Sequence, residues 1–194
     1  MRAISILEPW ASAIAFHGKD IENRTWPAPA KVVGQIVAIH ASAGLHELRG
    51  FRDLRHAPAH QRPLVELAHA GNCDATRCHY VATGIVAETL TEADFTALRW
   101  RSPWFCGPQG QRLAQVVPVT PSTRKMLGPV RGKLGYWTVG DDDALALLAD
   151  REHQLQGASM RVSGFCPVCD ALRFARLGEP GICGACSTML LPSR

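Results

Sequence analysis

The chain has 194 residues, of which 46% are hydrophobic and 20% are charged. This composition supports a packed core and excludes an intrinsically disordered chain. The length allows one domain of ordinary size and a small additional module. No run approaches the roughly 18 apolar residues of a membrane-spanning helix, and Glu8 and Pro9 interrupt the apolar N-terminal run, which excludes a signal peptide. We therefore expect a cytoplasmic protein without membrane contact.

The net charge of +4 is spread unevenly along the chain. Counting Lys and Arg against Asp and Glu, residues 1–140 carry +6, residues 141–156 carry −4 and residues 157–194 carry +2. A mild basic excess permits nucleic-acid binding but does not establish it. We expect a first domain over residues 1–140, an acidic helix and linker over residues 141–163, and a small module over residues 164–191.

Residues 6–26 (ILEPWASAIAFHGKDIENRTW) concentrate charged and aromatic side chains within an apolar segment. A short strand at residues 5–7 precedes Pro9, which suits the first turn of a helix. This helix begins with Trp10 and ends at Gly18, because glycine tolerates the left-handed conformation found past helix ends. The strand that follows has two unlike faces. It carries three charged side chains, those of Lys19, Glu22 and Arg24.

Short strands and short helices are expected along the rest of the first domain. Residues 35–41 predict a central strand, because both of its faces are apolar. Residues 43–70 predict helical structure interrupted by two prolines, and residues 120–131 a loop. Further strands are expected at residues 80–90, 111–120 and 134–139, and helices at residues 91–101 and 141–154. Such a mixture fits an α+β fold built on a small β-barrel better than a parallel α/β sheet.

Three motifs give residues 2–140 a family resemblance. They are PWAS at residues 9–12, GKDIENRTW at residues 18–26 and GQIVAIHAS at residues 34–42, supported by TGIVA at residues 83–87 and GYW at residues 135–137. Together they resemble the ASCH domain, which is named for its homology to activating signal cointegrator 1 and belongs to the PUA-like superfamily. The resemblance implies a PUA-like small β-barrel with helices at its rim.

The resemblance also implies an RNA or DNA site in the cleft between the helix after PWAS and the GKxxExR strand. There, Lys19 and Arg24 would contact phosphate or a base edge, and Glu22 would accept a hydrogen bond from a base or orient Lys19. The remaining candidate residues are aromatic side chains that bases could stack on and two polar residues at the end of the central strand: Trp10, Trp26, Trp104, His40 and Ser42.

Structural interpretations of the same residues are open at this point. Lys19, Glu22 and Arg24 would form an ion-pair cluster at the mouth of a barrel, and His40 would be a core histidine bonded to the backbone. We expect Trp10 to be largely buried and at least one of the three charged residues to line an open cleft.

An enzymatic alternative follows from the same resemblance. One branch of ASCH-like proteins comprises amidohydrolases that act on acetylated cytidine with a Lys, a Thr nucleophile and a Glu. Lys19 matches the Lys, but Glu22 stands where the Thr would be. Lys19 and Glu22 would still support acid–base chemistry, for instance RNA cleavage, if burial lowered the pKa of the lysine. We expect a binding protein, with an RNA- or nucleoside-processing enzyme as the alternative.

Four of the seven cysteines form two CxxC pairs separated by thirteen residues near the C-terminus. Each pair turns two thiolates toward one ion, and two pairs complete a tetrahedral site like that of a zinc ribbon. About 30 residues bury too little apolar surface to fold alone, so the metal would supply the stability. We expect one structural Zn²⁺, with iron as the alternative, in a module that contacts nucleic acid or a protein partner. Its ligands are Cys166, Cys169, Cys183 and Cys186.

Overall fold

A computed structural model describes residues 1–45, 72–94, 102, 104–105, 108–157, 161–166, 171–176 and 191–192. The chain divides into two compact units, Met1–Arg151 and Glu152–Arg194. Most of the helical structure expected at residues 43–70, most of that expected at residues 91–101, and three of the four expected metal ligands lie outside the described residues.

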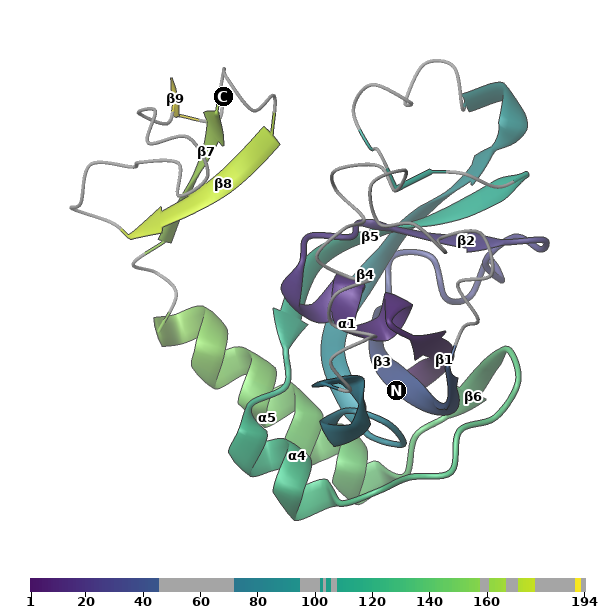
Figure 1. Ribbon diagram of the computed structural model, residues 1–194, viewed down its shortest axis with the longest axis vertical. Helices are drawn as coiled ribbons and strands as arrows, with labels where there is room; N and C mark the ends of the chain where they lie inside the picture. The colour runs from purple at the N-terminus through teal and green to yellow at the C-terminus, as the bar shows by residue number, and fades with distance from the viewer. Residues whose placement is uncertain are drawn as a thin grey trace. The chain divides into compact units, whose positions relative to one another are not determined.

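The first unit is built on a six-stranded sheet (Figure 1). The strand order is β2-β5-β4-β3-β1-β6. β1 and β3 pair in parallel, and every other neighbouring pair is antiparallel. The strands are β1 Arg2–Glu8, β2 Ile21–Arg24, β3 Ile36–Leu45, β4 Tyr80–Thr91, β5 Gln109–Pro118 and β6 Tyr136–Thr138.

The sheet does not close into the expected barrel. β2 and β6 lie at its two ends and are not paired with each other in the described part of the chain. β6 is only three residues long and pairs with residues 2–4 of β1, so the second half of β1 extends beyond it. Side chains cross the gap instead, because Tyr136 donates to Gln111 Oε1 at 2.7 Å and Arg24 Nη2 donates to the Ser5 carbonyl at 2.8 Å. The mixed α+β class is confirmed, and the closed barrel is wrong.

Four helices are described: α1 Trp10–Phe16, the 3₁₀ helix η2 Asn72–Ala75, α4 Pro121–Leu127 and α5 Asp141–Gly157. α5 matches the helix expected from its acidic start. α4 occupies most of the segment expected to be a loop. Its hydroxyl cap is Thr120, which accepts from Thr123 N at 3.3 Å, and Pro121 takes the first helical position.

Two hydrophobic cores cover the two faces of the sheet. One core packs Ile14 of α1 against Ile4, Val37 and Ile39. The other packs Leu147 of α5 against strand and aromatic residues that include Trp137. Since neighbouring side chains of a strand point to opposite faces, the strongly apolar β3 is central, as expected from its sequence.

A buried carboxylate fixes the start of α1 to the turn that follows η2. Glu8 is fully buried. Its oxygens accept from Ser12 N at 3.0 Å, from Ser12 Oγ at 3.0 Å and from Thr76 Oγ1 at 2.5 Å. The serine of the PWAS motif therefore has a structural role in this chain.

The second unit contains a small antiparallel sheet of order β8-β7-β9. Its strands are β7 Arg161–Cys166, β8 Ala171–Arg176 and β9 Leu191–Pro192. Cys166 pairs with Ala171 at the end of the β7–β8 hairpin, so the first CxxC pair spans the connection between these strands. Cys169, Cys183 and Cys186 lie outside the described residues.

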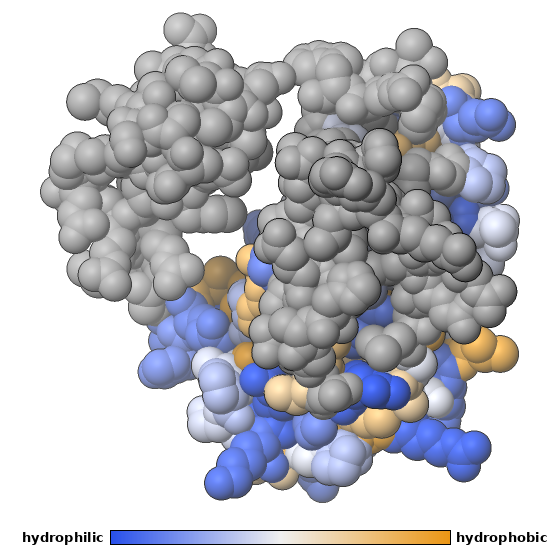
Figure 2. All heavy atoms as spheres, in the orientation of Figure 1, coloured by the Kyte–Doolittle hydropathy of each residue, from blue (hydrophilic) through white to orange (hydrophobic). Residues whose placement is uncertain are grey.

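The described surface is largely polar on the face drawn in Figure 2, where hydrophobic residues lie in small separate groups. In the described part of the chain, no helix combines the length and the apolar character that crossing a membrane requires.

Candidate functional site

A pocket of about 1040 Å³ opens along the part of β1 that extends beyond β6. Ser5, Ile6 and Leu7 line it on that side. From β2 and the turn before β2, it is lined by Lys19, Glu22, Asn23 and Arg24. The gap that keeps the sheet from closing is thus a concave site of the size that small-molecule ligands occupy.

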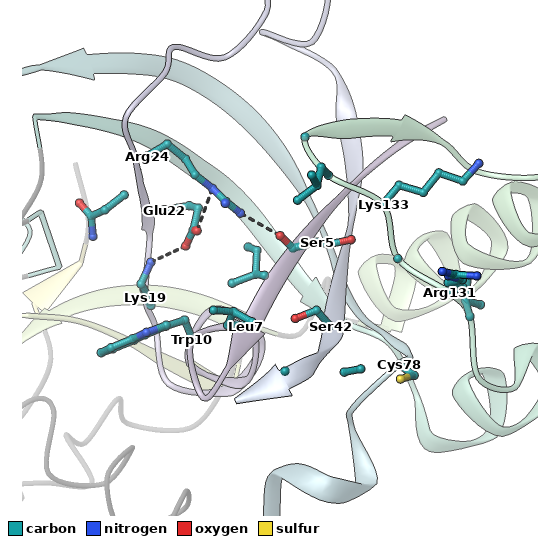
Figure 3. A pocket seen from close by; sticks show the side chains of 18 of the residues that line it. Ser5, Leu7, Trp10, Lys19, Glu22, Arg24, Ser42, Cys78, Arg131 and Lys133 are labelled. Carbon is teal, nitrogen blue, oxygen red and sulfur yellow. Dashed lines mark hydrogen bonds and ion pairs between the residues drawn. The ribbon is translucent and has the colours of Figure 1, made fainter. Parts of the chain in front are cut away.

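A continuous series of charged contacts forms one wall of this pocket, which we call the inner wall and define as Lys19, Glu22 and Arg24 (Figure 3). Lys19 Nζ lies 3.0 Å from Glu22 Oε2 and also donates to the Ile21 carbonyl. Glu22 Oε1 lies 3.1 Å from Arg24 Nε, and Arg24 Nη2 reaches the Ser5 carbonyl. Lys19 is 3% and Glu22 7% exposed, so salt screens this ion pair less than it screens a surface pair.

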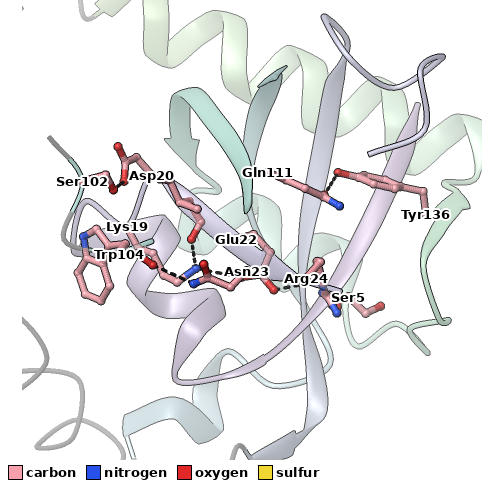
Figure 4. A network of polar contacts seen from close by, with 11 residues as sticks. Ser5, Lys19, Asp20, Glu22, Asn23, Arg24, Ser102, Trp104, Gln111 and Tyr136 are labelled. Atoms are coloured by element: carbon pink, nitrogen blue, oxygen red, sulfur yellow. Dashed lines mark hydrogen bonds and ion pairs between the residues drawn. The ribbon is translucent and has the colours of Figure 1, made fainter. Parts of the chain in front are cut away.

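Local sequence places the inner wall. Gly18 adopts a φ of +69°, which turns the chain sharply after α1, and Lys19 N then donates to the Ala13 carbonyl at 3.1 Å. Figure 4 shows how the flanking polar residues hold β2 in place. Asn23 Nδ2 donates to the Trp104 carbonyl at 2.8 Å, and Ser102 Oγ donates to Asp20 at 2.6 Å.

The aromatic candidates separate into two groups. Trp10 and Trp104 line the pocket, whereas Trp26 does not. Trp10 is of intermediate burial and packs against two hydrophobic clusters, so part of its ring remains accessible from the pocket. Trp26 instead lies edge-on to Tyr136 with ring centroids 5.9 Å apart, and the Arg24 guanidinium lies 5.6 Å from its ring. Trp10 is therefore the main aromatic surface available to a ligand.

His40 and Ser42 have different places. Ser42 lines the pocket. His40 is fully buried, and its Nε2 donates to the Val130 carbonyl at 2.9 Å. Burial lowers the pKa of His40, because the interior disfavours the charged ring. The structure thus favours the core interpretation of this histidine over direct ligand contact.

A loop that the sequence motifs do not indicate forms the opposite side of the pocket. Residues 129–135 line it, and we call this segment the cationic loop. Arg131 and Lys133 of this loop are exposed and make no ion pair or hydrogen bond with the described part of the chain. The signal available in the sequence was the run PVRGKLG at residues 129–135, in which Arg131 and Lys133 lie on either side of Gly132.

The charge of the pocket suits an anionic ligand. Its described lining has four cationic side chains and one carboxylate, that of Glu22. Glu22 occupies the place where the amidohydrolase pattern has a threonine, and it is engaged by both Lys19 and Arg24. Thr25, the nearest hydroxyl in sequence, is exposed and outside the described lining.

The predicted metal ligands do not belong to this pocket. Among the described residues, no cluster of three or more His, Cys, Asp or Glu side chains has the arrangement of a metal site. Cys73 and Cys78 form no disulfide bond within the described part of the chain.

No protein-family model and no curated protein matches the chain. Solved structures of the ASCH protein ZmASCH from Zymomonas mobilis do match. The unsubstituted protein gives a TM-score of 0.42 at 12% identity, over 76% of this chain and 93% of that chain. One mutant of it gives a TM-score of 0.43 at 12% identity, over 76% of this chain and 96% of that chain. A second mutant gives a TM-score of 0.41 at 13% identity, over 76% of this chain and 94% of that chain. The likeness carries no function across to this chain.

Proposed function

We propose that the Met1–Arg151 unit binds single-stranded nucleic acid, RNA or DNA, and receives one base in the pocket beside β1. The observation that supports this proposal best is the inner wall, where a carboxylate and two cations lie recessed next to a half-buried Trp10. A base offers both a ring to stack on and polar edges, and recessed polar groups read such edges. The ASCH resemblance of residues 9–42 points to the same class of ligand.

The carboxylate defines the preferred base edge. Each oxygen of Glu22 is already contacted by one cation, and a carboxylate oxygen has lone pairs for a second donor. An exocyclic amino group is such a donor, and carboxylates accept from it in base recognition. We therefore expect cytosine, adenine or guanine in the pocket in preference to uracil or thymine.

A charge-balanced variant tests the proposal. Replacing only Lys19 and Arg24 would leave Glu22 buried without a partner, at a cost of about 3–5 kcal/mol in stability. The triple variant Lys19→Gln, Glu22→Gln and Arg24→Gln avoids that cost and lowers the net charge by one, as does the control Lys125→Gln on α4, which is exposed and outside the pocket.

Fluorescence anisotropy with labelled single-stranded RNA and DNA of the same sequence gives the readout. The triple variant should bind at least about fivefold more weakly, because a good base-edge contact contributes about 1–3 kcal/mol. The control should bind like the wild type. Equal affinity of the triple variant and the wild type, with matching thermal melts, would rule out this pocket as the site.

A second proposal concerns the C-terminal cysteines. We propose that Cys166, Cys169, Cys183 and Cys186 hold one structural Zn²⁺ and form a zinc ribbon that adds nucleic-acid or protein contacts. The position of Cys166 at the end of the β7–β8 hairpin supports it, since zinc knuckles lie in such tight connections between strands. The ion would stabilise the small sheet by cross-linking its connections. Four protein ligands would leave no coordination position open, so the ion would have no catalytic role.

A further inference from the structure

We propose that Arg131 and Lys133 of the cationic loop bind the phosphates of the nucleic-acid strand whose base enters the pocket. This inference rests on the proposed nucleic-acid binding and adds a second set of contacts to it. The GKxxExR motif directs attention to Lys19 and Arg24, but the structure assigns the phosphate contacts to the other side of the pocket.

The first argument is the availability of hydrogen-bond donors. Lys19 and Arg24 already contact Glu22 and backbone carbonyls, and a phosphate would have to compete with these contacts. Arg131 and Lys133 are exposed, and both are free of partners in the described residues. Phosphate contacts come from such cations, and their binding energy arises largely from the release of counterions from the strand.

The second argument is that the loop is anchored at residues adjacent to both cations. Val130 N donates to the Cys78 carbonyl at 2.6 Å, and the Val130 carbonyl accepts from His40 Nε2 at 2.9 Å. His40 therefore acts as a buried positioning residue, which holds the cationic loop in place through its hydrogen bond to Val130.

Gly132 fixes the other contact of the loop with the sheet. A Cβ added at this glycine would lie 2.5 Å from Ser5 Oγ and 2.6 Å from the His40 ring, so only a residue without a side chain fits there. In an extended segment, alternate residues point to opposite sides. With Val130 and Gly132 against the protein, Arg131 and Lys133 point outward.

The third argument is the position of the two cationic groups. Figure 3 places Arg131 and Lys133 across the pocket from the inner wall, and the charged end of Lys133 is directed away from it. A base can enter a recessed pocket while its backbone stays outside, provided that the base is unstacked. The exposed loop is therefore suited to the backbone, and the buried inner wall to the base.

Salt dependence distinguishes these roles. The dissociation constants of full-length protein for a labelled 12-nucleotide RNA and for the matching DNA are measured between 50 and 200 mM NaCl. The variant is Arg131→Gln with Lys133→Gln, and the control is Lys31→Gln with Lys125→Gln, which removes the same charge from exposed sites outside the described pocket lining. Each phosphate contact on a single strand contributes about 0.7 to the slope of log affinity against log salt.

We expect the loop variant to have a slope smaller by about 1.4, so that the wild type loses about sevenfold more affinity than the variant over this range. The change should be the same for RNA and DNA, because the phosphodiester is common to both. Gly132→Ala should also weaken binding although no charge changes, whereas Gly140→Ala, whose added Cβ meets no atom within 4 Å, should not.

Two results would overturn the inference in different ways. A loop variant with the slope and affinity of the control, in a protein that binds RNA or DNA, places the phosphates elsewhere and leaves the proposed function intact. Failure of the wild-type protein to bind either strand at 50 mM salt rejects the proposed function and the phosphate assignment together.

Discussion

Single residues account for the main departures from the expected site. Glu22 is the central example, because it holds Lys19 and Arg24 together along the inner wall of the pocket. A threonine there would leave the two cations facing each other with no intervening anion. The carboxylate thus makes the pocket structurally stable and offers an acceptor to a ligand at the same time.

Glu8 provides a test of how much one buried carboxylate stabilises the fold. Glu8→Ala removes the acceptor for three hydrogen bonds from Ser12 and Thr76 and leaves buried donors unsatisfied. We expect a loss of about 2–4 kcal/mol in the free energy of unfolding, measured by urea denaturation. Glu88→Ala is the matched control, since its ion pair with Arg112 is exposed and should contribute less than about 1 kcal/mol. Similar losses in the two variants would contradict the role assigned to Glu8.

Local signals predict the elements unequally well. α1, the turn at Gly18 and α5 follow from adjacent residues, as do the apolar faces of β3. α4 was missed although Thr120, Pro121 and Gly128 are typical of a helix cap, first turn and end. The basic pair at residues 124–125 and the two prolines favoured a loop, but the prolines lie at the first turn and beyond the last, where a helix tolerates them.

Arg151 connects α5 to two strands of the sheet, β4 and β5, through hydrogen bonds. Its guanidinium is buried and donates to the Thr83 carbonyl at 3.3 Å, to Thr83 Oγ1 at 3.2 Å and to the Gln115 carbonyl at 2.8 Å. Gln115 has a positive φ of 47°, so β5 bulges at this contact.

Arg151→Ala should therefore loosen α5 before it unfolds the sheet. We expect faster amide hydrogen exchange in peptides from α5 than in those from β3, and a loss of about 1–3 kcal/mol in stability because buried carbonyls lose their donor. Glu152→Ala, at an exposed position on the same helix, should leave exchange unchanged. Uniform acceleration across the sheet and α5 would show that this contact does not act on α5 selectively.

At the scale of the whole molecule, the expected barrel and the observed sheet differ by one missing set of backbone pairs. Sequence patterns predict the strands, but the short length of β6 and its pairing with residues 2–4 alone depend on tertiary structure. The same limit applies to the site. One side comes from the contiguous motif at residues 18–24, whereas residues 129–135 are held beside the pocket by tertiary contacts that include those with Cys78 and His40.

The C-terminal unit is predicted to depend on metal, unlike the first. A module this small can bury only a limited amount of apolar surface, and such modules commonly need additional cross-links. Purified full-length protein should contain about one zinc ion per chain by mass spectrometry of the metals, because four cysteines complete one tetrahedral site.

Cys183→Ser should bring the zinc content to well below half, since three remaining thiolates bind more weakly. Cys78→Ser should retain the full content, because Cys78 lies in the first unit and forms no disulfide bond within the described part of the chain. Iron in place of zinc would identify a rubredoxin-like site with the same ligands, whereas full metal content in the Cys183→Ser protein would reject the ligand set. Because Cys183 lies far from the pocket in sequence and in a different compact unit, we expect binding of single-stranded RNA by the first unit to persist when the ion is lost.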